Sequence, residues 1–368
     1  MNLSSGKQTV LVVDDTPINI DVVKGILSEA YFIQAAINGK IALEIVAKQK
    51  PDLILLDVMM PDMDGYEVCR RLKSDPETRQ IPIIFLTAKR HGSNEVEGFL
   101  LGAADYIHKP VNPSILQARV KTHLALYDQR RDLEDQVAER TREIKQIQEV
   151  AMVAMGSLAE TRDPETGNHI RRTQHYVKLL AETLIEHPRF NGYLNRAVID
   201  LLFMSAPLHD IGKVGVPDYI LLKPGKLTDG EFEEMKKHTI YGRDAIAAAE
   251  SILGNHDSFL SLAKEIAYSH QEKWDGTGYP EGLAGDDIPI SARLMALADV
   301  YDALISQRVY KPPFSHEKAT AIIVEGKDLY FDPDIVTAFI KVADDFYAIA
   351  QRYMDSGEGV KGAICLAQ

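Results

Sequence analysis

The 368-residue chain has few cysteines, one tryptophan and no long apolar run, and these shortages exclude several classes of protein. Its two cysteines, Cys69 and Cys365, lie far apart in no metal-binding or redox pattern, which excludes a disulfide framework and a thiolate zinc site. No apolar run approaches the roughly 20 residues that a membrane-spanning helix needs. The first eight residues are polar and lead directly into an apolar segment, unlike a secretion signal. We therefore expect a cytoplasmic protein that enters no membrane.

Positive charge is also scarce, because 41 lysines and arginines stand against 54 acidic residues and give a net charge of −13. This balance argues against non-specific binding to nucleic acid. An anionic substrate would therefore need a local cationic pocket or bound metal ions. The hydrophobic fraction of 45% is that of a globular protein, and the length suits two domains with a connector.

The N-terminal third, residues 8–125, alternates short apolar runs with amphipathic stretches. Most of the runs are rich in Val, Ile, Leu or Phe, as strands buried on both faces of a parallel sheet should be. The runs are residues 10–13, 32–36, 53–56, 83–86 and 105–107. Helical patterns lie between them, so this region is predicted to be a doubly wound, five-stranded α/β domain.

A heptad pattern follows over residues 126–158. Apolar residues occupy its a and d positions from Leu126 to Leu158, with Arg130 and Arg140 as interruptions. Charged residues fill the other positions, and no proline or glycine occurs before Gly156. The pattern predicts a long helical stalk that pairs as a coiled coil in a homodimer. A helix that lies on its own domain is the alternative.

Residues 159–355 are predicted to form an all-α domain interrupted by a glycine-rich loop at 275–285. The helical periodicities cover residues 176–186, 197–207, 229–237, 244–251, 259–268, 290–305, 316–325 and 335–354.

Polar residues follow the strands predicted in the first domain. Asp14 and Asp15 come after the first strand and Asp57 after the third, so their carboxylates should meet at one edge of the sheet. Such a cluster needs a divalent cation, and its hard oxygen ligands suit Mg²⁺. Thr87 and Lys109 follow the fourth and fifth strands, where they could hold a phosphoryl group on Asp57.

The motifs VVDD, LLDVMMPDMDG, TA and KP together resemble the receiver domains of bacterial response regulators. The resemblance implies a sensor histidine kinase as partner and an output that lies C-terminal to the receiver. The implied roles are phosphoacceptor for Asp57, metal ligands for Asp14 and Asp15, phosphoryl contacts for Thr87 and Lys109, and switch aromatic for Tyr106.

Histidines and carboxylates recur in residues 160–311. Glu165 and His169 are four apart and share one face if helical, while His209 and Asp210 end an apolar run. Asp299 lies on another apolar helix, and charged groups persist in such places when they are paired or bound to metal. Four histidines with several carboxylates and no cysteine suit Fe or Mn, and more than one ion. A two-metal site supports in-line phosphoryl displacement.

The HDIGK, WDGTGYP and ADVYDAL motifs resemble the HD-GYP family of HD-superfamily phosphohydrolases. The resemblance implies metal-dependent hydrolysis of cyclic di-GMP to pGpG, to GMP or to both. The implied metal ligands are Glu165, His169, His209, Asp210, His238, His270 and Asp299, with Asp210 bridging. Asp210 and Lys213 are the implied catalytic residues, and the implied substrate contacts are Lys213, Tyr279, Arg308 and Lys311.

Gln271 departs from the family pattern, since many members have a second histidine at this position. We therefore expect two Fe or Mn ions. A third ion is the alternative, with Glu165 as an additional ligand. Two alternatives remain. One is a phosphodiesterase for cyclic GMP-AMP, because no residue here separates guanine from adenine. The other is a degenerate domain that binds cyclic di-GMP, or a diguanylate cyclase through its glycine-rich loop.

Overall fold

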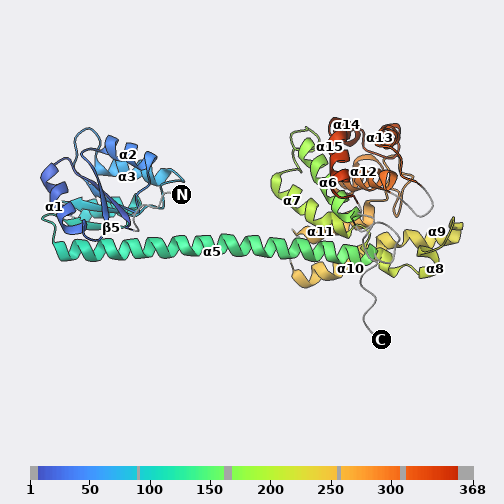
Figure 1. The fold of residues 1–368 in the computed structure, drawn as a ribbon, viewed down its shortest axis with the longest axis horizontal. Coiled ribbons are helices and arrows are strands. Elements are labelled where there is room, and N and C mark those ends of the chain that lie inside the picture. The colour runs from blue at the N-terminus through green and yellow to red at the C-terminus, as the bar shows by residue number, and fades with distance from the viewer. Residues whose placement is uncertain (1–6, 89–91, 161–167, 255–257, 307–311, 355–368) are drawn as a thin grey trace. The chain divides into compact units, whose positions relative to one another are not determined.

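The computed structural model describes residues 7–88, 92–160, 168–254, 258–306 and 312–354 (Figure 1). Two compact units divide the chain, Met1–Arg142 and Glu143–Gln368, and each is described by itself. None of the helices in the described ranges is both long and apolar enough to cross a membrane.

The first unit is built on a parallel five-stranded sheet with the strand order β2-β1-β3-β4-β5. The strands are β1 (Thr9–Val13), β2 (Phe32–Ala36), β3 (Leu53–Asp57), β4 (Ile83–Thr87) and β5 (Asp105–His108). Every residue of β3 and β4 is buried, which explains why these strands are continuously apolar. The predicted doubly wound fold is confirmed.

Alternate residues of each strand serve two separate cores, one on each face of the sheet. Leu11 and Val13 pack with α2 (Gly39–Lys48) and α3 (Gly65–Ser74) on one face. Val10 and Val12 pack on the other face with α1 (Pro17–Leu27) and the first turns of α5 (Pro113–Glu160). Helix α4 (Gly92–Leu100) connects β4 to β5. The sheet is thus covered by helices on both sides (Figure 1).

Helix α5 runs for 48 residues without interruption, as the heptad pattern predicts. Its start is buried through Leu116, Val120 and Leu124, whereas the heptad residues between Leu126 and Ile147 are exposed. An exposed apolar seam of this length is what a coiled-coil partner would cover.

The second unit is helical. Its elements are α6 (His169–Leu184), α7 (Arg196–Ser205), η1 (Ala206–Leu208), η2 (Ile211–Gly215), α8 (Asp218–Leu221), α9 (Asp229–Lys236), α10 (His238–Leu253), α11 (Phe259–Ser269), η3 (Gly285–Asp287), α12 (Ile290–Ile305), α13 (His316–Glu325), α14 (Pro333–Lys341) and α15 (Ala343–Arg352). Buried aromatic rings occupy its main core, where Tyr176 stacks on Phe346 with ring centroids 4.4 Å apart. The predicted all-α character is confirmed.

The single helix predicted over residues 335–354 is wrong, because the chain leaves the helical conformation at Val342. This break lets Phe339 and Phe346 from the two helices meet in one core, with 4.9 Å between their ring centroids. Packing outweighs the continuous local pattern here.

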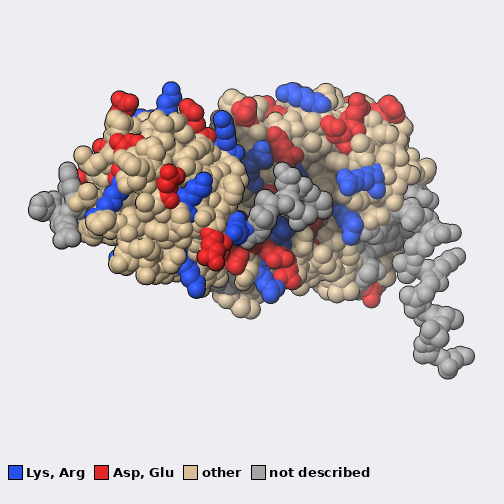
Figure 2. Space-filling view, turned by 60° about the vertical axis from the view of Figure 1, so that its left-hand side comes forward, with Lys and Arg blue, Asp and Glu red and all other residues tan. Residues whose placement is uncertain are grey.

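On the face shown in Figure 2, basic and acidic side chains are interspersed.

Candidate metal and phosphoacceptor sites

The carboxyl ends of two strands, β1 and β3, bring together the acidic residues predicted for the first unit. Asp57 ends β3 and Asp14 follows β1, and both side chains are buried. Oxygen atoms of Asp14, Asp15 and Asp57 lie within 4.8 Å of one another, a spacing that suits a single cation. Lys109, just after β5, places its Nζ 2.6 Å from Asp14 Oδ2 and 2.9 Å from Asp57 Oδ2.

At each of Asp57 and Lys109, burial and the neighbouring opposite charges shift the pKa in opposite directions. Burial raises the pKa of Asp57, and the hydrogen bond from Lys109 only partly offsets it. Burial also disfavours the charged form of Lys109, but its hydrogen bonds to Asp14 and Asp57 outweigh this effect and raise its pKa. The ammonium group therefore stays charged beside the carboxylate.

Thr87 and Tyr106 occupy the neighbouring strands β4 and β5. Thr87 ends β4 and is buried, close to the end of β3 that carries Asp57. The Tyr106 ring is also buried, with its centroid 5.2 Å from that of Phe85. A Cβ atom on Gly98 would come within 1.5 Å of the Tyr106 hydroxyl, so this glycine leaves room for an inward-facing ring.

In the second unit, the ends of several helices bring together four histidines and two carboxylates. His169 begins α6, His238 begins α10 and His270 follows α11. His209 and Asp210 lie between η1 and η2, and Asp299 lies within α12. They form two groups, His169 with His209 and Asp299, and Asp210 with His238 and His270; in each group the ligand atoms lie within 4.8 Å of one another.

Asp210 faces both groups, one with each carboxylate oxygen. Its Oδ1 lies 3.4 Å from His238 Nε2 and 3.5 Å from His270 Nε2. Its Oδ2 lies 3.3 Å from the Nε2 of His209, a member of the other group. In that group, His169 Nε2 is 3.3 Å from His209 Nε2 and 3.5 Å from Asp299 Oδ1. This is the arrangement that a carboxylate bridging two cations requires.

Three of these atoms are buried without a hydrogen-bond partner among the residues that the structure describes, namely Asp210 Oδ1, His238 Nε2 and His270 Nε2. A buried polar atom left unsatisfied costs about 1–3 kcal/mol, so three that converge on one point indicate a missing ligand. The imidazole and carboxylate donors suit a transition-metal cation. The residues therefore fit the metal ions that the sequence predicts.

Hydrogen bonds fix the tautomers of three of the histidines. The Nδ1 atoms of His209, His238 and His270 lie 2.8–3.0 Å from the carbonyl oxygens of Ala206, Met235 and Ile266. Because a carbonyl only accepts, each Nδ1 carries the hydrogen and each Nε2 lone pair faces the cluster. Burial lowers the pKa of His238 to about 4, which keeps this ring neutral.

Lys213 belongs to the same cluster, since its Nζ lies 2.8 Å from Asp210 Oδ2. Burial disfavours the charged form of Asp210, but the Lys213 ammonium holds the pKa of its carboxyl well below the usual range. Asp210 is therefore an anion, and Lys213 places a cation at the site that the sequence predicts for phosphate binding.

The glycine-rich loop places Tyr279 beside the cluster, with its ring centroid 6.2 Å from that of His238. Trp274 instead packs the loop, because the guanidinium groups of Arg189 and Arg293 lie 5.5 and 5.7 Å from its ring centroid. Glu165, Arg308 and Lys311, which the sequence also places in this site, lie outside the described residues.

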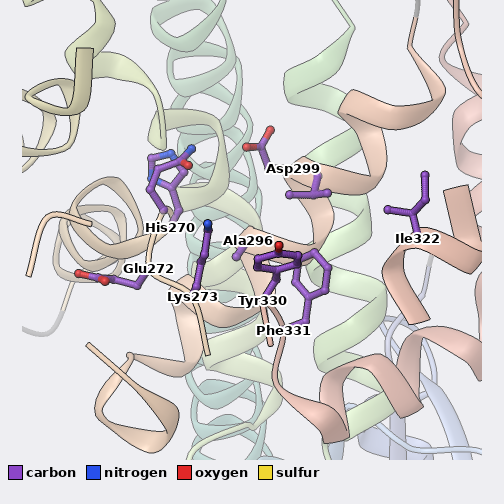
Figure 3. Close-up of a pocket in the computed structure, with 10 residues that line it drawn as sticks. His270, Glu272, Lys273, Ala296, Asp299, Ile322, Tyr330 and Phe331 are labelled. Carbon is purple, nitrogen blue, oxygen red and sulfur yellow. The ribbon is translucent and has the colours of Figure 1, made fainter. Parts of the chain in front are cut away.

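A pocket of about 290 Å³ opens beside the cluster (Figure 3). His270 and Asp299 lie at one end of it, and Tyr330 and Phe331 lie at the other. Gln271 also lines this pocket. A second pocket of about 220 Å³ also includes Asp299. The space beside the cluster is thus partly apolar and aromatic, as small-molecule sites usually are.

Gly212 is the residue of this site whose importance the sequence analysis missed. An added Cβ would lie 1.9 Å from the His238 carbonyl oxygen and 2.4 Å from the backbone nitrogen of Gly242. Only glycine allows η2 to approach α10 this closely, and this approach brings Asp210 to His238. The sequence does not show this backbone contact, but the glycine directly after His209-Asp210-Ile211 was the available signal.

Comparisons with known proteins identify a known domain in each of the two units. The receiver domain of response regulators matches residues 10–121, and the HD domain matches residues 155–335. The fold and these matches thus define a receiver domain followed by an HD domain. The chain belongs to the family of response regulators that carry a C-terminal HD-GYP domain, and both predicted resemblances are confirmed.

Three curated relatives are similar to this chain. "Probable cyclic di-GMP phosphodiesterase" of Vibrio cholerae serotype O1 is 52% identical over 94% of this chain and 80% of the relative. "Cyclic di-GMP phosphodiesterase response regulator RpfG" of Xanthomonas campestris is 35% identical over 79% of this chain and 75% of the relative. "3'3'-cGAMP-specific phosphodiesterase 2" of Vibrio cholerae is 39% identical over 55% of this chain and 36% of the relative.

Proposed function

We propose that this chain is a response regulator that hydrolyses cyclic di-GMP at the cluster centred on Asp210, under the control of phosphorylation at Asp57. The observation that carries the proposal is the Asp210 carboxylate, whose oxygens face two groups of imidazole nitrogens. The names of two relatives that align with most of the chain support cyclic di-GMP as the substrate. Residues 8–125, 126–158 and 159–355 are the proposed receiver, stalk and phosphodiesterase parts.

The cluster would hold two Fe or Mn ions, one on each group, with Asp210 shared between them. Bound metals would supply a hydroxide nucleophile and stabilise the phosphoryl oxygens. Gln271 faces the neighbouring pocket, which favours two ions over three, and Glu165 is the residue that could add a third.

The chain's own side chains would bind and orient the dinucleotide. Lys213 offers a cation to a phosphate oxygen beside Asp210, where a charge-assisted hydrogen bond is strongest. Tyr279 covers the His238 side of the cluster and would exclude water. Arg308 and Lys311 are proposed phosphate and base contacts on the ground of the family resemblance. Tyr330 offers a ring on which a base could stack, at the far end of the pocket in Figure 3.

The receiver would act through Mg²⁺ held by Asp14, Asp15 and Asp57. A sensor histidine kinase is the proposed phosphoryl donor, and Thr87, Tyr106 and Lys109 would report phosphorylation. We propose that the exposed heptads of α5 pair in a homodimer and carry the signal as a shift between two arrangements. The glycine-rich loop is the proposed docking site for a diguanylate cyclase, and the cytoplasm is the proposed location.

A phosphodiesterase for cyclic GMP-AMP is the second candidate, because a relative of that name is 39% identical over 55% of this chain. The test is turnover of anaerobically purified full-length protein with cyclic di-GMP and with cyclic GMP-AMP at equal concentrations, with metals counted in the same sample. Faster hydrolysis of cyclic di-GMP to pGpG or GMP supports the proposal. Preference for cyclic GMP-AMP favours the second candidate, and binding without turnover in metal-loaded protein indicates a degenerate domain.

A further inference from the structure

His169 differs from the other three histidines of the cluster in what holds its second ring nitrogen. The others donate from Nδ1 to backbone carbonyls, whereas His169 Nδ1 lies 2.8 Å from the carboxylate oxygen Oδ2 of Asp302. Asp302 lies one helical turn after Asp299 on α12 and is fully buried. The contact joins residues 133 positions apart, so it depends on the packing of α6 against α12.

Arg172 neutralises and orients this buried carboxylate. Its Nε lies 2.7 Å from Asp302 Oδ1 and its Nη2 lies 2.9 Å from Asp302 Oδ2, a bidentate pair. Further hydrogen bonds run from Nη2 to Ser306 Oγ at 3.0 Å and from Nη1 to the Tyr353 carbonyl at 3.0 Å. The guanidinium is thus held on several sides and keeps the plane of the Asp302 carboxylate fixed.

A buried ion pair is weak support for stability, because desolvation offsets much of its attraction. Its place next to His169 suggests another role. A carboxylate that accepts from Nδ1 leaves the Nε2 lone pair free to bind a cation, fixes the ring and increases the basicity of the donor. His169 Nε2 does face the cluster, 3.5 Å from Asp299 Oδ1.

We propose that Arg172 and Asp302 are positioning residues that set the tautomer, orientation and basicity of His169 as a metal ligand. The inference rests on the proposed metal-dependent function of the cluster. It assigns a task to Asp302, the second aspartate of the ADVYDAL motif. This task is distinct from that of Asp299, the first aspartate, which is a ligand candidate itself. Arg172 also donates to the carbonyl of Tyr353, directly after α15, so the hydrogen bonds of Arg172 and Asp302 link His169 to α15.

The chain offers a matched control in a second buried Arg–Asp pair. Arg293 Nη1 lies 2.7 Å from Asp332 Oδ2, and both side chains are nearly as buried as the first pair. Asp332 caps the N-terminus of α14 and also pairs with Arg189, so its described partners are structural. Loss of this pair should affect stability without reaching the cluster.

The experiment compares Asp302→Asn, Arg172→Lys and Asp332→Asn in the full-length chain. Mn²⁺ affinity is measured by titration of metal-free protein, and thermal unfolding is measured on the same samples. We expect Asp302→Asn and Arg172→Lys to weaken Mn²⁺ binding by about 10–100-fold, the usual effect of losing such a partner. Asp332→Asn should lower Tm about as much as Asp302→Asn does. It should leave Mn²⁺ affinity within about twofold of wild type.

Wild-type Mn²⁺ affinity in folded Asp302→Asn and Arg172→Lys would overturn the inference, as would an equal loss of affinity in Asp332→Asn. If Asp302→Asn does not fold, Arg172→Lys decides, because it retains the charge and removes only the bidentate geometry. The readout is independent of turnover. A wild-type protein that binds Mn²⁺ without hydrolysing cyclic di-GMP would refute the proposed function and leave this inference standing.

Discussion

Replacing Gly212 by alanine tests how the backbone builds the metal site. The added Cβ would lie 1.9 Å from the His238 carbonyl oxygen, whereas Cβ contacts shorter than 3.0 Å essentially do not occur. Taking 1.9 from 3.0, η2 and α10 must separate by at least about 1.1 Å. The atoms in contact are backbone, so no side chain can move aside to relieve the clash.

A displacement of this size is large for a metal site, where ligand distances are met within about 0.2 Å. Separation of η2 from α10 would draw Asp210 away from His238, which removes the bridging geometry. We expect Gly212→Ala to lower Mn²⁺ affinity at least about 100-fold, since partners outside the ligand shell alone are worth about 10–100-fold. Overpacking should also destabilise the fold by about 1–3 kcal/mol.

The assay is Mn²⁺ titration and thermal unfolding of the full-length protein, with Gly230→Ala as control. Gly230 lies in α9 of the same unit, and an added Cβ would meet nothing within 4 Å. The control should keep wild-type affinity and gain up to about 1 kcal/mol of helix stability. Wild-type affinity and stability in Gly212→Ala would refute the argument that this close contact sets the site.

Three further predictions address other parts of the chain. Burial raises the pKa of the Cys69 thiol to about 11, so a Cys365→Ser protein should resist alkylation at pH 8, where only about 0.1% is thiolate; prompt labelling of the native protein would contradict this. Arg308→Ala and Lys311→Ala should raise KM more than they lower metal content, because they are proposed to hold substrate; loss of metal would reverse that assignment. Beryllofluoride should raise turnover about 5–150-fold in wild type and leave Asp57→Ala unchanged, whereas an equal response in both would separate the receiver from this active site.

The sequence predicted the first unit well because its signals are local. Continuous apolar strands such as residues 53–56 and 83–86 indicate a sheet covered on both faces, and the carboxylates follow these strands directly. The long α5 was equally predictable from its heptads. The break at Val342 was not, because it depends on Phe339 and Phe346 meeting in a common core.

The metal site was predictable as a set of residue types and only partly as an arrangement. The HDIGK and ADVYDAL motifs identified Asp210 and Asp299 as candidates, and the structure brings both into the cluster. The pairing of Arg172 with Asp302 joins residues 130 positions apart, and no local pattern carries that information. Motifs therefore gave the candidate donors, whereas the partners that orient those donors required the fold.

The proposed function requires the Asp210 carboxylate to serve two metal ions in a hydrolytic site. The most direct measurement is cyclic di-GMP hydrolysis by Asp210→Ala beside wild type, with Fe and Mn counted in both samples. We expect the variant to remain helical, to lose bound metal and to hydrolyse several orders of magnitude more slowly, because both groups lose a shared ligand. Full activity of a folded Asp210→Ala protein with verified metal content would refute this role of Asp210.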